Sequence, residues 1–306
     1  MTNNKKSVLL PERLAQLKQP GATYIISCYD DEYFCLNHSE GCWRGFFSLY
    51  LQAIHGIQFA TRIGLPYHVD FGNLTYRYSD EKNFNGDRNL WSYYFEQDSL
   101  GESNLKILNV RNENYPLRVW SRAFIRKLHE QAVTKLVLKA DIQNSIDQME
   151  TQFKGLNILG IHIRRSDHFH EVKHASLSSY FKTVNRMINS FDKIFVATDD
   201  ESILQDFLKY PEKVLQIQAC RSSGTLAVHA NMKTENRYQL GKEALLECYS
   251  LAMCNKVILS PSNLSYAALM INPTLEYELI ESWAARFKRW KTLIVFYLDQ
   301  WKIRKW

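Results

Sequence analysis

The amino-acid sequence predicts an α/β protein whose second half is built around a parallel β-sheet. The run LNILGIHI at 156–163 is apolar almost without interruption, which is typical of a strand buried on both faces of a parallel sheet. Strand-like and helix-like segments then alternate four times as far as residue 271. The composition is ordinary for a globular protein, with 45% apolar and 23% charged residues among 306, so disordered and fibrous classes are excluded.

The second half is expected to contain four strand–helix pairs, joined by right-handed crossovers. The expected strands are 156–163, 193–199, 213–217 and 255–260. The expected helices are 177–190, 201–210, 242–254 and 263–271.

The first half is also expected to be α/β, with longer loops. The segment 22–28 is rich in β-branched and aromatic residues and predicts a strand, and the loop 39–45 that follows contains Gly41 and Gly45. Helical spacing of apolar residues then runs to Gly64. The remaining expected elements are strands at 66–73 and 106–110, loops over 72–104 and mostly helix over 118–153. We expect domains at 1–150 and 151–280, with a boundary near 145–155, and a C-terminal helix at 281–306.

The positive charge of the chain is concentrated at its C-terminal end. The net charge is +6, and residues 284–306 hold seven basic residues and one acidic residue, so the remainder is neutral. This distribution argues little for nucleic-acid binding by the body of the protein. The segment 281–306 also contains four tryptophans around the apolar run LIVFYL. It predicts either a helix at an anionic lipid surface, and so a peripheral membrane contact, or a helix that packs back on the domains.

Composition also bears on the expected compartment. No apolar run is long enough to span a bilayer, and the first residues lack the pattern of a secretory signal. Six cysteines occur without a Cys-x-x-Cys pair, which is not a disulfide scaffold. We therefore expect a cytoplasmic protein.

Polar clusters follow three of the expected strands. They are Arg-Arg-Ser-Asp at 164–167, Thr-Asp-Asp at 198–200 and Ser-Pro-Ser-Asn at 260–263. Because the carboxyl ends of parallel strands share one edge of a sheet, the three clusters are expected to lie together. Guanidinium groups and a helix N-terminus bind phosphate, and carboxylates accept from ribose or from the N–H edge of guanine. The clusters therefore predict a site for a nucleoside diphosphate.

Each cluster also has a structural interpretation. The arginines could form a surface ion pair with Asp167, and both Asp200 and Ser262 could be ordinary helix caps. The chain has no G-x-G-x-x-G and no P-loop, and no Asp-x-Asp for a metal, so the arginines are expected to neutralise the diphosphate and no metal is expected. Three nearby histidines could bind a metal, but a partner ligand cluster is not evident, and histidines in a loop near an anionic substrate can act as donors to it. They are His168, His170 and His174.

Three segments carry a resemblance to a known family. IHIRRSDHFHE at 161–171 resembles the H-x-R-R-x-D motif of the α1,6-fucosyltransferases and the bacterial nodulation fucosyltransferases. KIFVATDDESIL at 193–204 and LLECYSLAMCNKVILSPSNLSYAALM at 245–270 are similar to the second and third motifs of that superfamily. The resemblance covers about 155–272, and it departs most at Tyr266, where the family typically has arginine.

The resemblance implies a GT-B fold, in which two Rossmann-like domains face a central cleft, with the acceptor on the N-terminal side. It also implies an inverting, metal-independent glycosyltransferase that uses GDP-fucose as donor and needs no cofactor. Carried over by motif, Arg164 and Arg165 would hold the diphosphate, Asp199 or Asp200 the nucleoside, and Ser262 with Asn263 a phosphate. Glu171 would be the base, although an exposed loop carboxylate is an equal interpretation.

The acceptor side is less defined by the sequence. Gly41 and Gly45 would let the backbone of the loop 39–45 approach a ligand closely, although the loop could equally be a simple strand-to-helix connection. The aromatic stretch 90–97 could stack on acceptor sugars or pack in the core. The expected acceptor is a glycan or a glycolipid. The alternatives are a GT-B transferase with another nucleotide sugar, or a non-catalytic glycan- or nucleotide-binding protein on the same scaffold.

Overall fold

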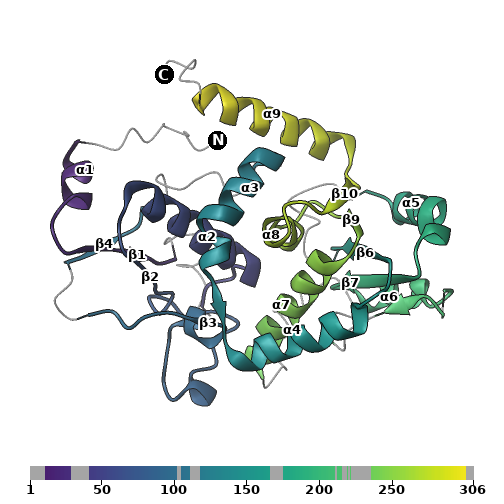
Figure 1. Cartoon of the computed structure of the whole chain (residues 1–306), viewed down its shortest axis with the longest axis horizontal. Helices are drawn as coiled ribbons and strands as arrows, with labels where there is room; N and C mark the ends of the chain where they lie inside the picture. The colour runs from purple at the N-terminus through teal and green to yellow at the C-terminus, as the bar shows by residue number, and fades with distance from the viewer. Residues whose placement is uncertain are drawn as a thin grey trace. The chain divides into compact units, whose positions relative to one another are not determined.

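The computed structural model describes residues 11–28, 41–101, 105–110, 118–165, 175–210, 212–215, 219, 221 and 236–300. The chain divides into two compact units (Figure 1). Unit 1 comprises Met1–Lys139 and Lys291–Trp306, and unit 2 comprises Ala140–Trp290. The first division therefore falls at the start of helix α4 (Ala140–Phe153), and the second falls inside helix α9 (Trp283–Gln300).

Unit 2 contains a five-stranded parallel sheet in the order β10-β9-β6-β7-β8. The central strand pairs along its whole length with β7, from Ile158 opposite Lys193 to Ile163 opposite Thr198. The predicted parallel sheet is confirmed, and the sequence missed only its fifth strand, β10. The strands are β6 (Ile158–Ile163), β7 (Lys193–Thr198), β8 (Val214–Leu215), β9 (Lys256–Leu259) and β10 (Glu276–Leu279).

Helices cover both faces of this sheet. Alternate β6 residues, among them Ile161 and Ile163, pack in one apolar cluster with Val184 of α5 and Phe207 of α6. The β6 residues between them face α7 and α8, which explains why the whole strand is apolar or uncharged. The helices are α5 (Leu177–Met187), α6 (Glu201–Phe207), α7 (Arg237–Met253) and α8 (Asn263–Ile271), and α4 packs beside α7 (Figure 1).

Gly160 lets α7 lie close to the sheet. A Cβ at this position would come within 2.8 Å of both Cys254 Sγ and Val257 Cγ1, and within 3.1 Å of Leu251 Cδ2. Distances of this kind leave no room for a methyl group. The glycine in the apolar run is therefore a packing requirement of the α7 face.

Unit 1 contains a three-stranded parallel sheet in the order β2-β1-β4. The long helix α2 packs on β1 so closely that a Cβ at Gly56 would lie 2.8 Å from Ile26. The helix ends as the sequence predicts, because Gly64 adopts the left-handed conformation with φ 74°. The elements are α1 (Pro11–Leu17), β1 (Ala22–Ile26), α2 (Phe46–Ile63), β2 (Tyr67–Val69) and β4 (Leu105–Leu108).

The long connection after β2 is organised by aromatic packing. Its short elements are η2 (Glu81–Phe84), η3 (Leu90–Tyr93) and β3 (Phe95–Glu96), and β3 pairs with β5 (Val137–Leu138). The aromatic rings expected either to stack on sugars or to pack are at most 5% exposed, so they form core. They are Trp91, Tyr93, Tyr94 and Phe95.

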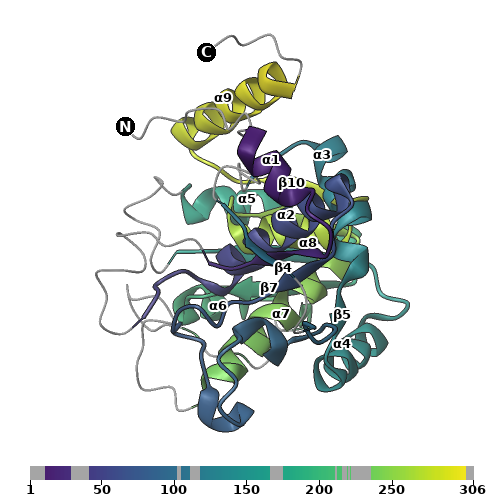
Figure 2. The same cartoon turned by 90° about the vertical axis from the view of Figure 1, so that its left-hand side faces the viewer.

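The C-terminal part of the chain forms a helix, as predicted. Within unit 1, its end packs on α3 (Arg122–Gln131), since Phe296 lies 4.7 Å from Phe124 between ring centroids and Tyr297 hydrogen bonds to Ser121. Figure 2 shows α9 in yellow. No helix in the described part of the chain is both long and apolar enough to cross a membrane.

Candidate functional site

The strand order of unit 2 creates a switch point between β6 and β9. The chain moves from β6 to β7 and β8 on one side, and then returns to place β9 on the other side of β6. The connections that leave β6 and β9 therefore diverge to opposite faces of the sheet. In open parallel sheets, the crevice at such a point is where ligands bind.

Backbone hydrogen bonds hold the predicted polar clusters together at this edge. The Arg164 N–H donates to Ser260 Oγ over 3.1 Å, and the Arg165 N–H donates to Asp199 Oδ1 over 2.9 Å. The loops after β9, β6 and β7 are thus joined across the switch point. The three segments singled out in the sequence lie together, as their strand order requires.

The two arginine side chains have different surroundings. Arg165 Nη2 donates to Ala175 O over 3.4 Å, and its buried Nε has no hydrogen-bond partner in the described part of the chain. Burial raises the pKa of Tyr180, while its hydrogen bond with Ser260 and the positive charge of Arg165 oppose the rise. Arg165 is therefore a half-buried cation with an unsatisfied N–H group, and Arg164 is half-buried beside it.

Ser262 caps helix α8 with its own side chain. Its Oγ accepts from the Ser265 N–H over 3.0 Å, and the residue is 2% exposed. Ser265 Oγ in turn lies 2.7 Å from Nδ1 of His162, so a buried polar chain joins β6 to α8. Because the Ser262 hydroxyl is used inside the protein, a phosphate here would meet the backbone N–H groups of the first turn, beginning with Asn263.

The two aspartates after β7 also differ. Asp200 is the N-cap of α6, where Oδ1 accepts from the N–H and the hydroxyl of Ser202 over 2.9 and 2.6 Å. This is the structural interpretation that the sequence left open. Asp199 instead accepts a hydrogen bond from the Arg165 N–H and interacts electrostatically with a carboxyl on α7.

That carboxyl belongs to Glu247, which sequence reasoning missed. Burial raises its pKa to about 8; the Arg221 guanidinium opposes this rise, and Asp199 and Glu243 add to it. Its Oε1 lies 3.7 Å from Arg221 Nη2, and the Glu247 side chain is 12% exposed. A single acid inside the apolar run LLECYSLAMC was the available signal.

Gly45 lies in unit 1, at the N-cap of α2. Its φ of −66° is open to any residue, and no atom of the described residues lies within 4 Å of an added Cβ. At Gly41, φ is 94° and an added Cβ would lie 2.5 Å from Thr75 O, so this glycine is required by packing within the protein.

Several predicted residues fall outside the described residues. They are the proposed base Glu171, the ion-pair candidate Asp167 and the histidines His168, His170 and His174. Among the residues that are described, no group of three or more His, Cys, Asp or Glu side chains is arranged to hold a metal.

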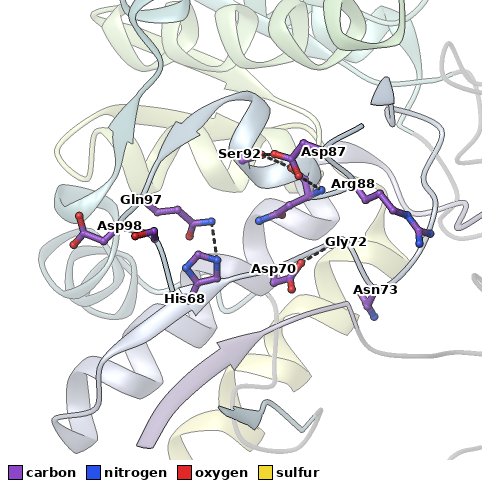
Figure 3. A pocket seen from close by; sticks show the side chains of 11 residues that line it. His68, Asp70, Gly72, Asn73, Asp87, Arg88, Ser92, Gln97 and Asp98 are labelled. Atoms are coloured by element: carbon purple, nitrogen blue, oxygen red, sulfur yellow. Dashed lines mark hydrogen bonds between the residues drawn. The ribbon is translucent and has the colours of Figure 1, made fainter. Parts of the chain in front are cut away.

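A polar pocket of about 640 Å³ lies at the end of β2 in unit 1 (Figure 3). Two amide side chains pair with the edge strand there. Gln97 accepts from the Val69 N–H over 3.1 Å and donates to Val69 O over 2.8 Å, and Asn89 also donates to Val69 O over 2.8 Å. Part of the lining is thus structural, because it completes an open sheet edge.

The rest of the lining is acidic. Burial lowers the pKa of His68, with Asp70 opposing, which favours a neutral imidazole. The charged groups are then three carboxylates against the single guanidinium of Arg88. Asp70 accepts from the Gly72 N–H over 2.8 Å with Oδ1, and its other oxygen has no hydrogen-bond partner among the described residues. This pocket suits hydroxyl groups or a cation, and not a diphosphate.

Comparisons with known proteins place the fold. No protein-family model and no curated protein match the sequence. The structure of NodZ α-1,6-fucosyltransferase soaked with GDP-fucose matches at 16% identity and a TM-score of 0.50, covering 82% of this chain and 92% of that chain. The structure of fucosyltransferase NodZ from Bradyrhizobium matches at 16% identity and a TM-score of 0.49, covering 82% of this chain and 93% of that chain. The structure of POFUT1 in complex with GDP-fucose matches at 10% identity and a TM-score of 0.38, covering 85% of this chain and 74% of that chain.

The predicted resemblance to the fucosyltransferase superfamily is therefore confirmed at the level of the fold. The chain is a mixed α/β protein with parallel sheets whose fold is similar to that of the NodZ fucosyltransferase.

Proposed function

We propose that this protein is a glycosyltransferase that transfers fucose from GDP-fucose to a glycan or glycolipid. One observation carries the proposal. Two consecutive arginines follow β6 at the switch point, and their backbone N–H groups are fixed by Ser260 and Asp199. Because the backbone of both arginines is held in place, their side chains extend from defined positions, which favours recognition of a diphosphate. The fold likeness to a fucosyltransferase whose crystals were soaked with GDP-fucose supports this donor.

The donor roles follow from the surroundings of each group. Arg164 and the unsatisfied Nε of Arg165 bind the diphosphate, and the first turn of α8, from Asn263, adds backbone N–H groups. Asp199 and Glu247, which interact electrostatically, are assigned to the nucleoside, where carboxyl oxygens accept from ribose hydroxyls or from the N–H edge of guanine. Asp200 and Ser262 position these groups by capping α6 and α8.

The proposed chemistry is an inverting displacement. The acceptor hydroxyl oxygen forms a bond to C1 of fucose while the bond from C1 to the phosphate oxygen breaks. The acceptor proton passes to a base, for which Glu171 remains the candidate from the motif, and the electron pair leaves on GDP. The arginines stabilise the charge that develops on the diphosphate, so no metal is required.

The acceptor is proposed to bind in unit 1. The pocket at the end of β2 has a volume of about 640 Å³, within the range of small-molecule sites. Its carboxylates, and above all the unengaged oxygen of Asp70, suit the donating hydroxyls of a neutral sugar. The finer GT-B arrangement, with two Rossmann-like domains facing a cleft, is part of the same proposal.

Thermal-shift measurements with GDP, UDP, dTDP and CMP test the donor. Binding to the folded state raises the melting temperature, and we expect GDP to do so most. Turnover of GDP-fucose with mixed glycan acceptors, in the presence of excess EDTA, then tests transfer. A larger rise in melting temperature with another nucleotide would mean that the donor carries that nucleotide and not GDP. If GDP raises the melting temperature but no GDP is released from GDP-fucose, the protein binds the nucleotide without catalysing transfer. Loss of turnover in EDTA would refute metal independence.

A further inference from the structure

Helix α9 presents an exposed apolar stripe along one side. Trp283, Phe287, Trp290 and Ile294 are 80%, 62%, 55% and 52% exposed. Their spacing of four, three and four residues places them within about 60° of one another around the helix axis. The rings of Trp283 and Phe287 stack, with an interplanar angle of 6°. The side chains therefore form one continuous apolar surface in water.

Other contacts hold the helix in place without using this stripe. Arg289 donates to both carboxylate oxygens of the buried Glu281 at the start of the helix. Near its end, Phe296 and Tyr297 contact α3. In the described part of the chain, the stripe is thus not needed to attach α9.

Basic residues border the stripe on both sides. Arg286 and Lys291 fall about 60° and 80° to either side of Trp283 on a helical projection, and Lys288 lies beyond Lys291. All three are exposed. Asp299 is the only acidic residue within the helix. An apolar aromatic strip between cations is the pattern of a helix that lies in a bilayer interface.

We propose that the α9 stripe, with Arg286, Lys288 and Lys291, binds the surface of an anionic lipid bilayer. Trp283 and Trp290 would lie at headgroup depth, and the basic side chains would contact acidic headgroups. Pairing of two copies through the stripe is disfavoured because it would bring the same cations together. The proposal does not depend on the identity of the nucleotide or the sugar.

Vesicle flotation of the full-length protein tests the proposal. We expect binding to vesicles of phosphatidylcholine mixed with phosphatidylglycerol, little binding to phosphatidylcholine alone, and loss of binding at high salt because the charge contribution is screened. Tryptophan emission should shift to shorter wavelength on binding, as the exposed indoles leave water.

Matched variants distinguish lipid binding by the stripe from lipid binding by exposed apolar side chains elsewhere. Combined W283S, F287S and W290S should lower the bound fraction at least tenfold, and combined K288E and K291E should do the same on anionic vesicles. Combined V137S and L208S, at exposed apolar positions 59% and 43% accessible elsewhere, should bind as the wild type does. Melting temperatures confirm that each variant is folded.

Three results would overturn the proposal. The first is a wild-type protein that stays unbound at low salt. The second is equal binding by the stripe variant. The third is a wild-type dimer in size-exclusion chromatography that the stripe variant abolishes, because the stripe would then be a contact between copies.

Discussion

The parallel sheets of the two units both carry polar side chains at their carboxyl ends, but they use them differently. In unit 2, side chains from neighbouring strands hold backbone N–H groups, as Asp199 does for Arg165, and the guanidinium groups extend from this fixed backbone. In unit 1, Gln97 and Asn89 complete the open edge of β2. A polar cluster at a sheet edge therefore indicates a ligand site only where groups remain after the sheet itself is satisfied.

The largest expected effect concerns the arginines of unit 2. Replacing Arg164 or Arg165 by alanine should lower the transfer rate by about 10²-fold, or about 2.7 kcal/mol, because a contact that strengthens as the diphosphate leaves is lost. Lysine should not restore the rate, since it lacks the planar fork of donors. Steady-state turnover of GDP-fucose measures this.

A matched control also comes from unit 2. Arg186→Ala removes an exposed guanidinium that pairs with Glu278 over 2.7 Å, and it should leave the transfer rate and the response to GDP unchanged. Full activity in both the Arg164 and Arg165 alanine variants would show that the diphosphate binds elsewhere.

A second prediction compares packing glycines. Gly160→Ala should destabilise the protein by about 1–3 kcal/mol, because the new methyl group overlaps Cys254 and Val257. Gly45→Ala meets no atom of the described residues within 4 Å and should leave the melting temperature nearly unchanged. Equal stability of the two variants in urea unfolding would mean that α7 is free to move away from the sheet.

A third prediction concerns the edge strand β2 of unit 1, which pairs with side chains. Gln97→Ala should lower the free energy of unfolding by about 1–3 kcal/mol, because it removes the partner of the Val69 N–H. Hydrogen exchange at the Val69 amide should accelerate in this variant. Gln205→Ala, which breaks one exposed bond to Glu201 on α6, is the control and should change stability little. Unchanged exchange at Val69 would mean that the edge is protected in another way.

The last prediction is a pH dependence from Glu247. Its folded pKa of about 8 lies above the value of an unfolded glutamate, near 4.5. Between these values the folded state binds more protons, so this group's contribution to stability is full below pH 4.5 and is lost as pH rises towards 8.

Glu247→Gln should therefore flatten the decline of unfolding free energy between pH 5 and 8 by up to about 1.4 kcal/mol per pH unit. Glu276→Gln, at an exposed position of β10, keeps the buried carboxyl and its charged neighbours and should leave the slope as it is. Denaturant midpoints across this pH range provide the measurement, and identical slopes in the wild type and Glu247→Gln would contradict the raised pKa.

The sequence predicted unit 2 better than unit 1, for physical reasons. Strand β6 is buried on both faces, so its composition alone identifies it. Strand β10 was missed because EYEL lies at the sheet edge, half-buried and alternating with charge. In the connection after β2, Trp91 and its neighbours are placed by tertiary packing that no local periodicity encodes.

The site shows a similar limit. Strand order brought Arg164, Arg165 and Asp199 together in the prediction, because parallel strands end at one edge. The direction of each side chain did not follow from the sequence, and Ser262 and Asp200 proved to be helix caps. Glu247 comes from the middle of a helix, so a search of strand ends passed over it.

Gly160 lets a residue inside the sheet control the position of a polar side chain on α7. Leu251 and Cys254 rest against its bare Cα, and Glu247 lies one turn before Leu251 on the same helix. The depth at which α7 sits on β6 thus helps to set where the Glu247 carboxyl lies. A single methyl group in the middle of the strand would shift that carboxyl, while every polar residue stayed in the sequence.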